Sequence, residues 1–288
     1  THLLFQMNEI HILTIKSREE VFEKSKNFWE SYGWKVIPTY NDGEHPSVGR
    51  NKILRKFYDS NDDWICVADD DIVLLNQDEF NNHPNVKYLE GVEFPTLNYI
   101  DFLTNNERLF ESHFLPTSFC PTNPVGVEGM WVCQRLSKLF GEYKRHWVFE
   151  RLTNLSCMFF HRNTKKLYDK EFYQDETLPA AEDWEWSMRQ IDEGLTTARL
   201  TNIVCGEITG KGDSAVFPGE TISESKLKRR TALVEAKQLI EKKYDDISLT
   251  KNGGLNTRQW IKRKWNPPTF EYGLGSPWDK TKLVIEDI

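Results

Sequence analysis

Three consecutive aspartates, Asp69, Asp70 and Asp71, are the residues best suited to chemistry in this sequence. They follow the apolar run 64–68 and precede a second apolar run, 72–74. The first run is short and rich in residues typical of strands, so it predicts a strand buried on both faces of a sheet. Ligands of α/β proteins gather at the carboxyl ends of such strands, and carboxylates there suit a hard divalent ion shared with a substrate phosphate. The alternative interpretation is an idle, solvated acidic turn.

A second pair of carboxylates, Glu182 and Asp183, precedes Trp184 in a segment that is expected to begin a helix. Acidic side chains near a helix N-terminus interact favourably with the helix dipole, which would explain the pair without any function.

Two segments are candidates for binding an anion. Gly49 and Arg50 are expected at the start of a helix, where free backbone N–H groups favour a phosphate; an ordinary helix start is the alternative. The stretch 206–219 contains Lys211 between two glycines and is expected to be a flexible loop that closes over phosphates. Lys211 could neutralise a leaving diphosphate there, unless the segment is merely a solvated hairpin loop.

Taken together, the two acidic motifs resemble, over roughly residues 9–215, those of GT-A glycosyltransferases. These enzymes hold a nucleotide-sugar diphosphate through a metal ion, so the resemblance implies a UDP-sugar donor and a Mn²⁺ or Mg²⁺ ion. The outer aspartates Asp69 and Asp71 would bind the ion, with Asp71 the more direct ligand. The residues expected to bind the nucleotide sugar are Thr14, Arg50, Asp69, Asp70 and Lys211.

The same resemblance implies the remaining roles. Glu182 and Asp183 would be catalytic, binding a hydroxyl of donor or acceptor and acting as base in inverting members of the family. Trp184 would offer a platform for a sugar ring. Many GT-A enzymes use a third metal ligand, often histidine, but no histidine follows His161 here; Asp213 is the expected substitute, with a water molecule as the alternative. His161 itself is expected to be a strand-end histidine, with a role beside the metal or acceptor as the alternative.

The elements that must position these residues indicate an α/β fold. Strand 10–15, a helix opened by a capping box at residues 17–20 and ended by Gly33, and strand 34–38 form a parallel crossover unit. The expected fold is GT-A: a Rossmann-like, nucleotide-sugar-binding mixed sheet flanked by helices, with a helical basic C-terminal region. We expect a catalytic domain at 7–222 and an extension packed on it at 223–288.

Composition sets the class of protein. The 288 residues are 39% hydrophobic and 13% aromatic, enough for a sizeable core. Five scattered cysteines without a Cys-x-x-Cys spacing favour free thiols in a reducing compartment. No signal peptide or apolar run near 18 residues is present, so a cytoplasmic protein without a membrane span is expected. Residues 1–6 are expected to be a remnant of cloning, with Met7 the natural start.

The net charge of −7 is unevenly distributed. Residues 226–264 hold twelve Lys and Arg against four Asp and Glu, which indicates a segment facing a polyanion. Solvated helix faces are the alternative. A helix is expected from Ser223 to about Tyr244, with Leu227, Leu233, Val234, Ala236 and Ile240 facing inward. The predicted DNA contacts are Arg229, Arg230, Arg258, Lys262 and Arg263.

The stretch 251–258, Lys-Asn-Gly-Gly-Leu-Asn-Thr-Arg, and the basic, tryptophan-containing sequence after it resemble bacteriophage enzymes that glycosylate hydroxymethylcytosine in DNA. The nearest group is the T-even phage β-glucosyl-hydroxymethylcytosine α-glucosyltransferases. The implied reaction moves glucose from UDP-glucose to glucosylated hydroxymethylcytosine in double-stranded DNA, in the cytoplasm of an infected bacterial host. Two alternatives remain: a bacterial glycosyltransferase acting on a surface-polysaccharide or lipid-linked glycan, and a non-catalytic nucleic-acid-binding protein.

Overall fold

The computed structural model describes residues 8–76, 97–110, 118–126, 147–149, 157–161, 171–193, 197–207, 222–251 and 255–264. Two of the predicted site residues, Lys211 and Asp213, lie outside the described residues. The segment 1–6 and the sequence beyond residue 264 lie outside them too.

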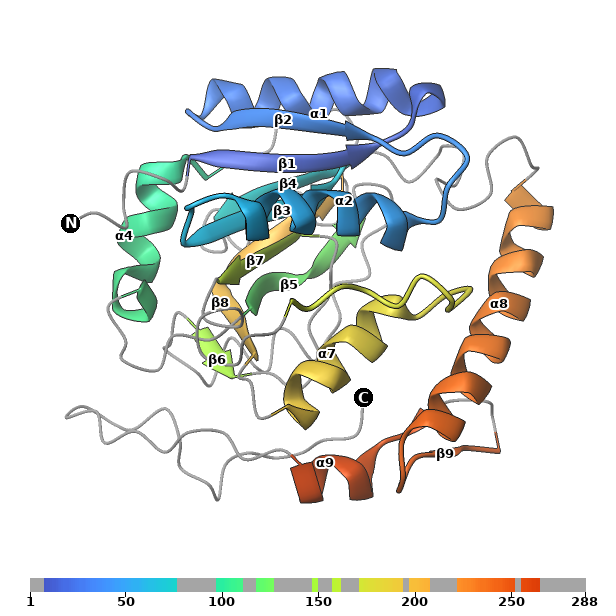
Figure 1. The fold of residues 1–288 in the computed structure, drawn as a ribbon. Coiled ribbons are helices and arrows are strands. Elements are labelled where there is room, and N and C mark those ends of the chain that lie inside the picture. The colour runs from blue at the N-terminus through green and yellow to red at the C-terminus, as the bar shows by residue number, and fades with distance from the viewer. Residues whose placement is uncertain are drawn as a thin grey trace.

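An eight-stranded mixed sheet forms the centre of the molecule, with strand order β2-β1-β3-β7-β5-β8-β4 and β6 paired to β8 (Figure 1). Its strands are β1 (Glu9–Thr14), β2 (Lys35–Tyr40), β3 (Trp64–Asp69), β4 (Ile72–Asn76), β5 (Ser118–Gly126), β6 (Trp147–Phe149), β7 (Cys157–His161) and β8 (Thr197–Glu207). Helices flank this sheet, so the predicted α/β class with a mixed sheet is confirmed.

The N-terminal part of the sheet is parallel and places the carboxyl ends of its strands at one edge. β1 pairs in parallel with β2 and with β3, and its register sets Leu13 opposite Asp69. Helix α1 (Glu19–Ser31) connects β1 to β2, and α2 (Pro46–Asp59) connects β2 to β3. Thr14 at the end of β1 and the aspartates at the end of β3 therefore lie at the same edge.

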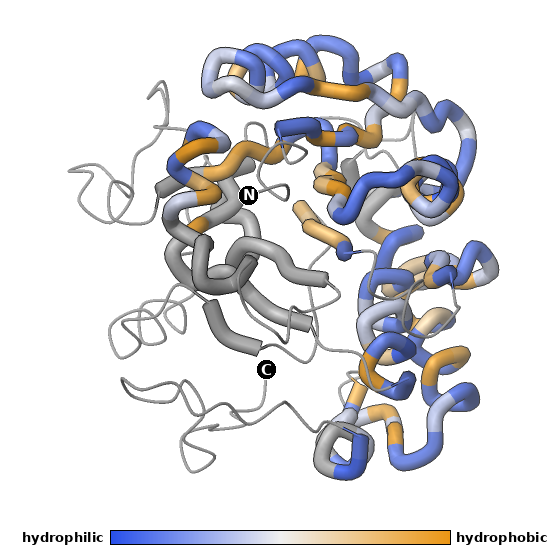
Figure 2. The backbone as a smooth tube through the Cα atoms, turned by 60° about the vertical axis from the view of Figure 1, so that its left-hand side comes forward, coloured by the Kyte–Doolittle hydropathy of each residue, from blue (hydrophilic) through white to orange (hydrophobic). Residues whose placement is uncertain are grey.

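Both faces of the sheet are covered, because alternate residues of its strands pack against different helices. Trp64, Cys66 and Ala68 of β3 belong to one apolar cluster with α1 and α4 (Tyr99–Phe110). Ile65 and Val67 belong to the other, with α2 and α7 (Glu182–Asp192). The prediction of a strand buried on both faces is confirmed. Figure 2 shows that the outer helix α1 is mostly hydrophilic, as expected for a helix with one buried face.

The C-terminal elements are α8 (Ile222–Lys243), β9 (Ser248–Leu249), β10 (Leu255–Asn256) and α9 (Arg258–Lys264). They pack on α7 through a third apolar cluster, to which Met188 of α7, Ala236 and Ile240 of α8, and Trp260 of α9 contribute. No helix in the described parts of the chain combines the length and apolar character needed to cross a membrane.

Three local predictions are wrong. Leu227 of α8 is 66% exposed, because the part of α8 that packs on α7 is its C-terminal half. Val234 lies in that half but is 50% exposed and does not belong to the apolar cluster that Leu233, Ala236 and Ile240 join. Ser17 does not cap α1, since residues 16–18 form a 3₁₀ turn and Arg18 occupies the N-cap position. Arg50 is not at a helix start, because α2 already begins at Pro46.

Two glycines have defined structural roles, one at the end of α1 and one inside α2. Gly33 adopts a left-handed conformation, φ 86°, immediately after the C-terminus of α1, as predicted. Gly49 allows α2 to approach β1, since a Cβ at this position would lie 2.3 Å from Leu13 Cδ1 and 2.8 Å from Asn41 Cγ. This close approach sets the position of Arg50, the next residue along α2.

Candidate functional site

A single arginine joins the two acidic motifs. Arg50 of α2 donates from Nη2 to Asp69 Oδ1 at 2.8 Å and from Nη1 to Glu182 Oε1 at 3.0 Å. Its side chain is only 10% exposed, so water has little access to these two hydrogen bonds. The carboxyl end of β3 and the first turn of α7, distant in sequence, thus form one site.

A second arginine, Arg18, binds the rest of the aspartate triplet. Its Nε donates to both oxygens of Asp70 at 2.9 and 3.0 Å, and its Nη2 donates to Asp70 Oδ1 and Asp71 Oδ2, each at 2.7 Å. Thr14 Oγ1 also donates to Asp70 Oδ2 at 2.8 Å. Thr14 and Asp70, both predicted to bind the donor, therefore contact each other, and both oxygens of Asp70 accept hydrogen bonds.

Arg18 is a site residue that the sequence analysis did not identify. The sequence pattern predicts Arg18 only as part of a capping box, whereas its side chain bonds the carboxylates at the end of β3. One sequence signal was available: Arg18 follows strand β1 closely, and the neighbouring parallel strand ends in three carboxylates that need counter-charge.

The carboxylates outnumber the cations. Asp69, Asp70, Asp71, Glu182 and Asp183 face two guanidiniums among the described residues. Two of these carboxylates, Asp183 and Asp69, have raised pKa values. Desolvation, assisted by the neighbouring Glu182 carboxylate, raises the pKa of Asp183 to about 6. Desolvation also raises the pKa of Asp69, although Arg50 opposes that change.

The donor atoms fit the chemistry of a hard divalent ion, because the site offers carboxylate oxygens and an excess of negative charge. Asp69 and Asp71 are the residues that would hold it. Asp69 is one-third exposed, and Arg50 bonds its Oδ1. In the described part of the chain no three metal-ligating side chains converge, and the predicted third ligand, Asp213, lies outside that part.

Two other predicted features lie elsewhere. β7 runs antiparallel to β3, which pairs His161 with Trp64 at the end of β3 opposite to Asp69. The rings of His161 and Trp64 have centroids 4.4 Å apart, so this histidine is a strand-end residue and not part of the carboxylate site.

Trp184 packs against the apolar cluster of α7, α8 and α9, with Lys237 Nζ 5.9 Å from its ring centroid. Its role as a sugar platform stays a prediction.

The predicted DNA-binding residues occupy the C-terminal helices. Arg229 and Arg230 are exposed on α8. Arg263 of α9 pairs with Asp246 at 2.8 Å, which offsets part of its charge. Arg258 and Lys262 lie in α9, and their side chains are outside the described residues.

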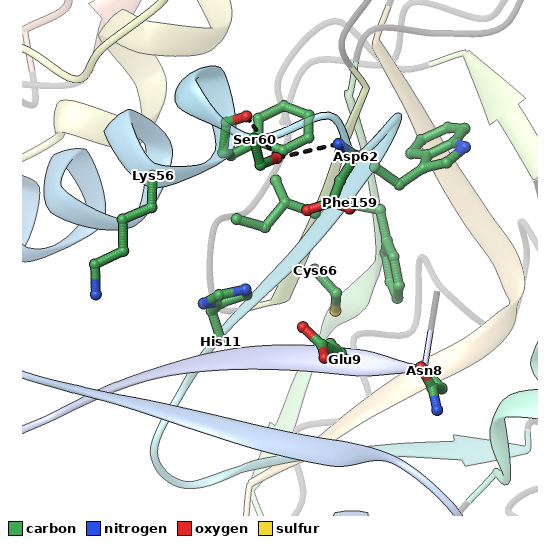
Figure 3. A pocket seen from close by; sticks show the side chains of 11 residues that line it. Asn8, Glu9, His11, Lys56, Ser60, Asp62, Cys66 and Phe159 are labelled. Atoms are coloured by element: carbon green, nitrogen blue, oxygen red, sulfur yellow. Dashed lines mark hydrogen bonds between the residues drawn. The ribbon is translucent and has the colours of Figure 1, made fainter. Parts of the chain in front are cut away.

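One cavity of about 320 Å³ lies beside the amino-terminal ends of β1 and β3 (Figure 3). Its lining includes Glu9 and His11 of β1, Lys56 of α2, and Asp62, which precedes β3. Burial lowers the pKa of His11, whose Nδ1 is buried without a hydrogen-bond partner. The aspartates follow the opposite ends of these strands, so the cavity is separate from the carboxylate site.

No protein-family model matches the chain, and no curated protein matches its sequence. Several solved structures are similar in fold. A197 from STIV is 13% identical over 69% of this chain and 84% of its own, with a TM-score of 0.36. S. aureus TarS 1–349, in complex with UDP-GlcNAc, is 13% identical over 81% of this chain and 66% of its own, with a TM-score of 0.46.

GalNAc-T7 with UDP, GalNAc and Mn²⁺ is 10% identical over 81% of this chain, with a TM-score of 0.41. This chain spans 47% of the GalNAc-T7 chain, and so less than half of it. Likenesses of this degree are too weak to assign a function, which depends instead on the side chains of the site.

Proposed function

We propose that this chain is a metal-dependent GT-A glycosyltransferase that uses a UDP-sugar as donor. The observation that carries the proposal is the Arg50 bridge between Asp69 and Glu182. In the proposed reaction the donor-side motif and the acceptor-side motif must bring together the two atoms that form the new bond, the anomeric carbon of the donor sugar and the hydroxyl oxygen of the acceptor. The guanidinium of Arg50 contacts one residue of each motif at the carboxyl ends of the strands, so the two motifs lie close together, as this reaction requires.

The donor side consists of Asp69, Asp71 and Arg50. The two aspartates would hold Mn²⁺ or Mg²⁺, which when bound offsets the negative charge of the donor diphosphate. Arg50 is a permanent cation beside them and would stabilise the phosphate oxygen that gains charge as the sugar leaves. The anomeric carbon loses its bond to this oxygen and gains one to the acceptor hydroxyl oxygen.

The acceptor side consists of Glu182 and Asp183. One of these carboxylates would bind the acceptor hydroxyl, and it would accept the hydroxyl proton if the base mechanism operates. A pKa of about 6 suits Asp183 to this task, because the group is mainly ionised at pH 7 yet basic enough to take a proton near neutrality.

For the acceptor we propose a hydroxyl of glucosylated hydroxymethylcytosine in DNA, with glucose as the transferred sugar. Support comes from the exposed Arg229 and Arg230 of α8 and from the excess of basic residues in 226–264. Exposed cations of this kind contact phosphates without reading sequence.

The test is release of UDP from a panel of UDP-sugars, with Mn²⁺ or Mg²⁺, in the presence and absence of duplex DNA containing glucosylated hydroxymethylcytosine. We expect release that EDTA abolishes and that this DNA stimulates. Metal-dependent release without any effect of DNA would retain the transferase and exclude the DNA acceptor. No release from any UDP-sugar would contradict the proposal.

Paired variants make the assignment specific. Asp71→Asn should abolish UDP release while the protein stays folded. Asp59→Asn removes an exposed carboxylate at the end of α2 and should leave release unchanged. Normal release by the Asp71 variant would remove this residue from the metal site.

A further inference from the structure

The three consecutive aspartates occupy different environments. Asp70 is 4% exposed, and Arg18 and Thr14 together satisfy both of its oxygens. Asp69 has a side chain that is one-third exposed, with Arg50 on one oxygen. Asp71 is intermediate, with a 15% exposed side chain whose Oδ2 accepts from Arg18. Buried, saturated carboxylates are structural anchors, whereas partly open ones remain accessible to a ligand.

Arg18 contacts both Asp70, the buried structural anchor, and Asp71, a proposed metal ligand. Its Nη2 lies 2.7 Å from Asp70 Oδ1 and equally 2.7 Å from Asp71 Oδ2, and the arginine side chain is only 10% exposed. The guanidinium therefore sits beside an oxygen that a cation at Asp71 would also use. The repulsion between a guanidinium and a divalent ion at this range is weakly screened, since solvent has little access.

We propose that Arg18 is a built-in counter-ion, which keeps the turn of Asp70 and Asp71 assembled before metal binds and then competes with the metal for Asp71. This inference rests on the proposed function, because it requires Asp71 to be a metal ligand. Asp70 keeps its bonds to Arg18 and Thr14 throughout, and only the contact with Asp71 yields. The competition lowers metal affinity, so that the ion binds well only when a donor diphosphate adds its own oxygen ligands.

The matched control is Lys16, two residues before Arg18. Lys16 carries the same charge, but its side chain is 81% exposed and pairs with Asp42 at 3.7 Å, away from the triplet. Arg18→Gln and Lys16→Gln thus remove equal charge from the same turn, and only the first removes a contact with Asp70 and Asp71.

The experiment measures Mn²⁺ binding without donor, from the electron paramagnetic resonance signal of free Mn²⁺, for the wild type and both variants. Arg18→Gln should bind Mn²⁺ at least about tenfold more tightly, because a positive charge within hydrogen-bond range of the ligand is gone. Lys16→Gln should stay within about twofold of the wild type, since its charge is solvent-screened. Unchanged or weaker binding by Arg18→Gln would overturn the inference and leave Arg18 as a residue that only orients the ligands.

Thermal unfolding provides a second readout. Without metal, Arg18→Gln should have a lower Tm than the wild type, and saturating Mn²⁺ should raise its Tm by more than it raises the wild-type Tm. If this variant does not fold, Arg18→Met replaces it: methionine keeps an aliphatic side chain of similar length and also removes the charge, so tighter Mn²⁺ binding is again expected. An equal or smaller Tm gain in the folded variant would contradict the competition.

The variant Asp71→Asn distinguishes a failure of the role proposed for Arg18 from a failure of the proposed metal site. If it abolishes Mn²⁺ binding while the Arg18 variants bind no more tightly than the wild type, the metal site stands and the role of Arg18 is wrong. If the wild type does not bind Mn²⁺ even with UDP present, or binds it equally well without Asp71, the proposed function loses its metal site and the inference fails with it.

Discussion

Two carboxylates of helix α7 stand two residues apart and have opposite surroundings. Glu185 is fully buried and accepts hydrogen bonds from Lys243 Nζ at 2.5 Å, Tyr244 Oη at 2.9 Å and Arg189 Nη2 at 3.1 Å. The side chain of Asp183 accepts from the backbone N–H of Trp184 at 2.9 Å and lies near a second carboxylate, Glu182.

This difference separates a structural charge from a functional one. The partners of Glu185 compensate its burial and fasten α7 to the residues at the end of α8. Asp183 lacks comparable compensation, and its pKa rises to about 6 as a result. A carboxylate held in unfavourable surroundings, while its neighbour in the same helix is fully paired, is typical of a site kept for chemistry.

The largest expected effect is on the chemical step. Glu182→Gln should lower kcat for UDP-sugar turnover by about 10²- to 10⁴-fold, the range for loss of a group that handles the acceptor proton. Folding should be nearly unaffected, as circular dichroism and urea unfolding would show. A loss below about threefold would place the catalytic group at Asp183 alone.

Glu185→Ala should act on stability instead. We expect the free energy of unfolding to fall by about 1–3 kcal/mol, because the change leaves the buried hydroxyl of Tyr244 without its acceptor, whereas Lys243 is partly exposed and keeps its pair with Asp175. Urea unfolding measures this, with Glu193→Ala, an exposed residue after α7, as a control that should change by less than about 0.5 kcal/mol. A cost under 1 kcal/mol would show that α8 is held by its apolar contacts alone.

Asp183→Asn should stabilise the protein while removing activity. The folded-state pKa of about 6 lies above the ordinary 3.8, so the folded state binds the proton more tightly, and wild-type stability is lost as the pH rises through this interval. The advantage of the variant should be absent below about pH 4, grow up to about pH 6 and then stay constant at about 1–2 kcal/mol, allowing for partial exposure. Unfolding free energies at pH 4, 5, 6 and 8 measure this, and an advantage that does not depend on pH would refute the shifted pKa.

The smallest effect is expected at the exposed arginines. Reversing the charge of Arg229 and Arg230 should weaken binding of duplex DNA about tenfold at low salt and flatten its salt dependence, without changing UDP release. Fluorescence anisotropy of labelled DNA at several salt concentrations gives both quantities. Unchanged affinity would place any nucleic-acid surface elsewhere.

The sequence was informative where the structure depends on local pattern. The apolar run ending in Asp69 predicted a doubly buried strand, and Gly33 predicted the end of α1; both are confirmed. It was uninformative where contacts are made across the fold. Arg18 reaches Asp70 across 52 residues, and the outward position of Leu227 depends on how much of α8 contacts α7. Helical spacing predicts on which face of α8 Leu227 lies, but it does not show whether another element packs against that face.

The most direct measurement is calorimetric titration of UDP into the wild type and Asp71→Asn, each with Mn²⁺ and with EDTA. A site in which Asp69 and Asp71 hold an ion for the diphosphate should bind UDP in the wild type with Mn²⁺, and lose that binding with EDTA or without the Asp71 carboxylate. Equal UDP affinity in all four titrations, or no binding of UDP in any of them, would contradict the assignment of this edge of the sheet as a nucleotide-sugar site.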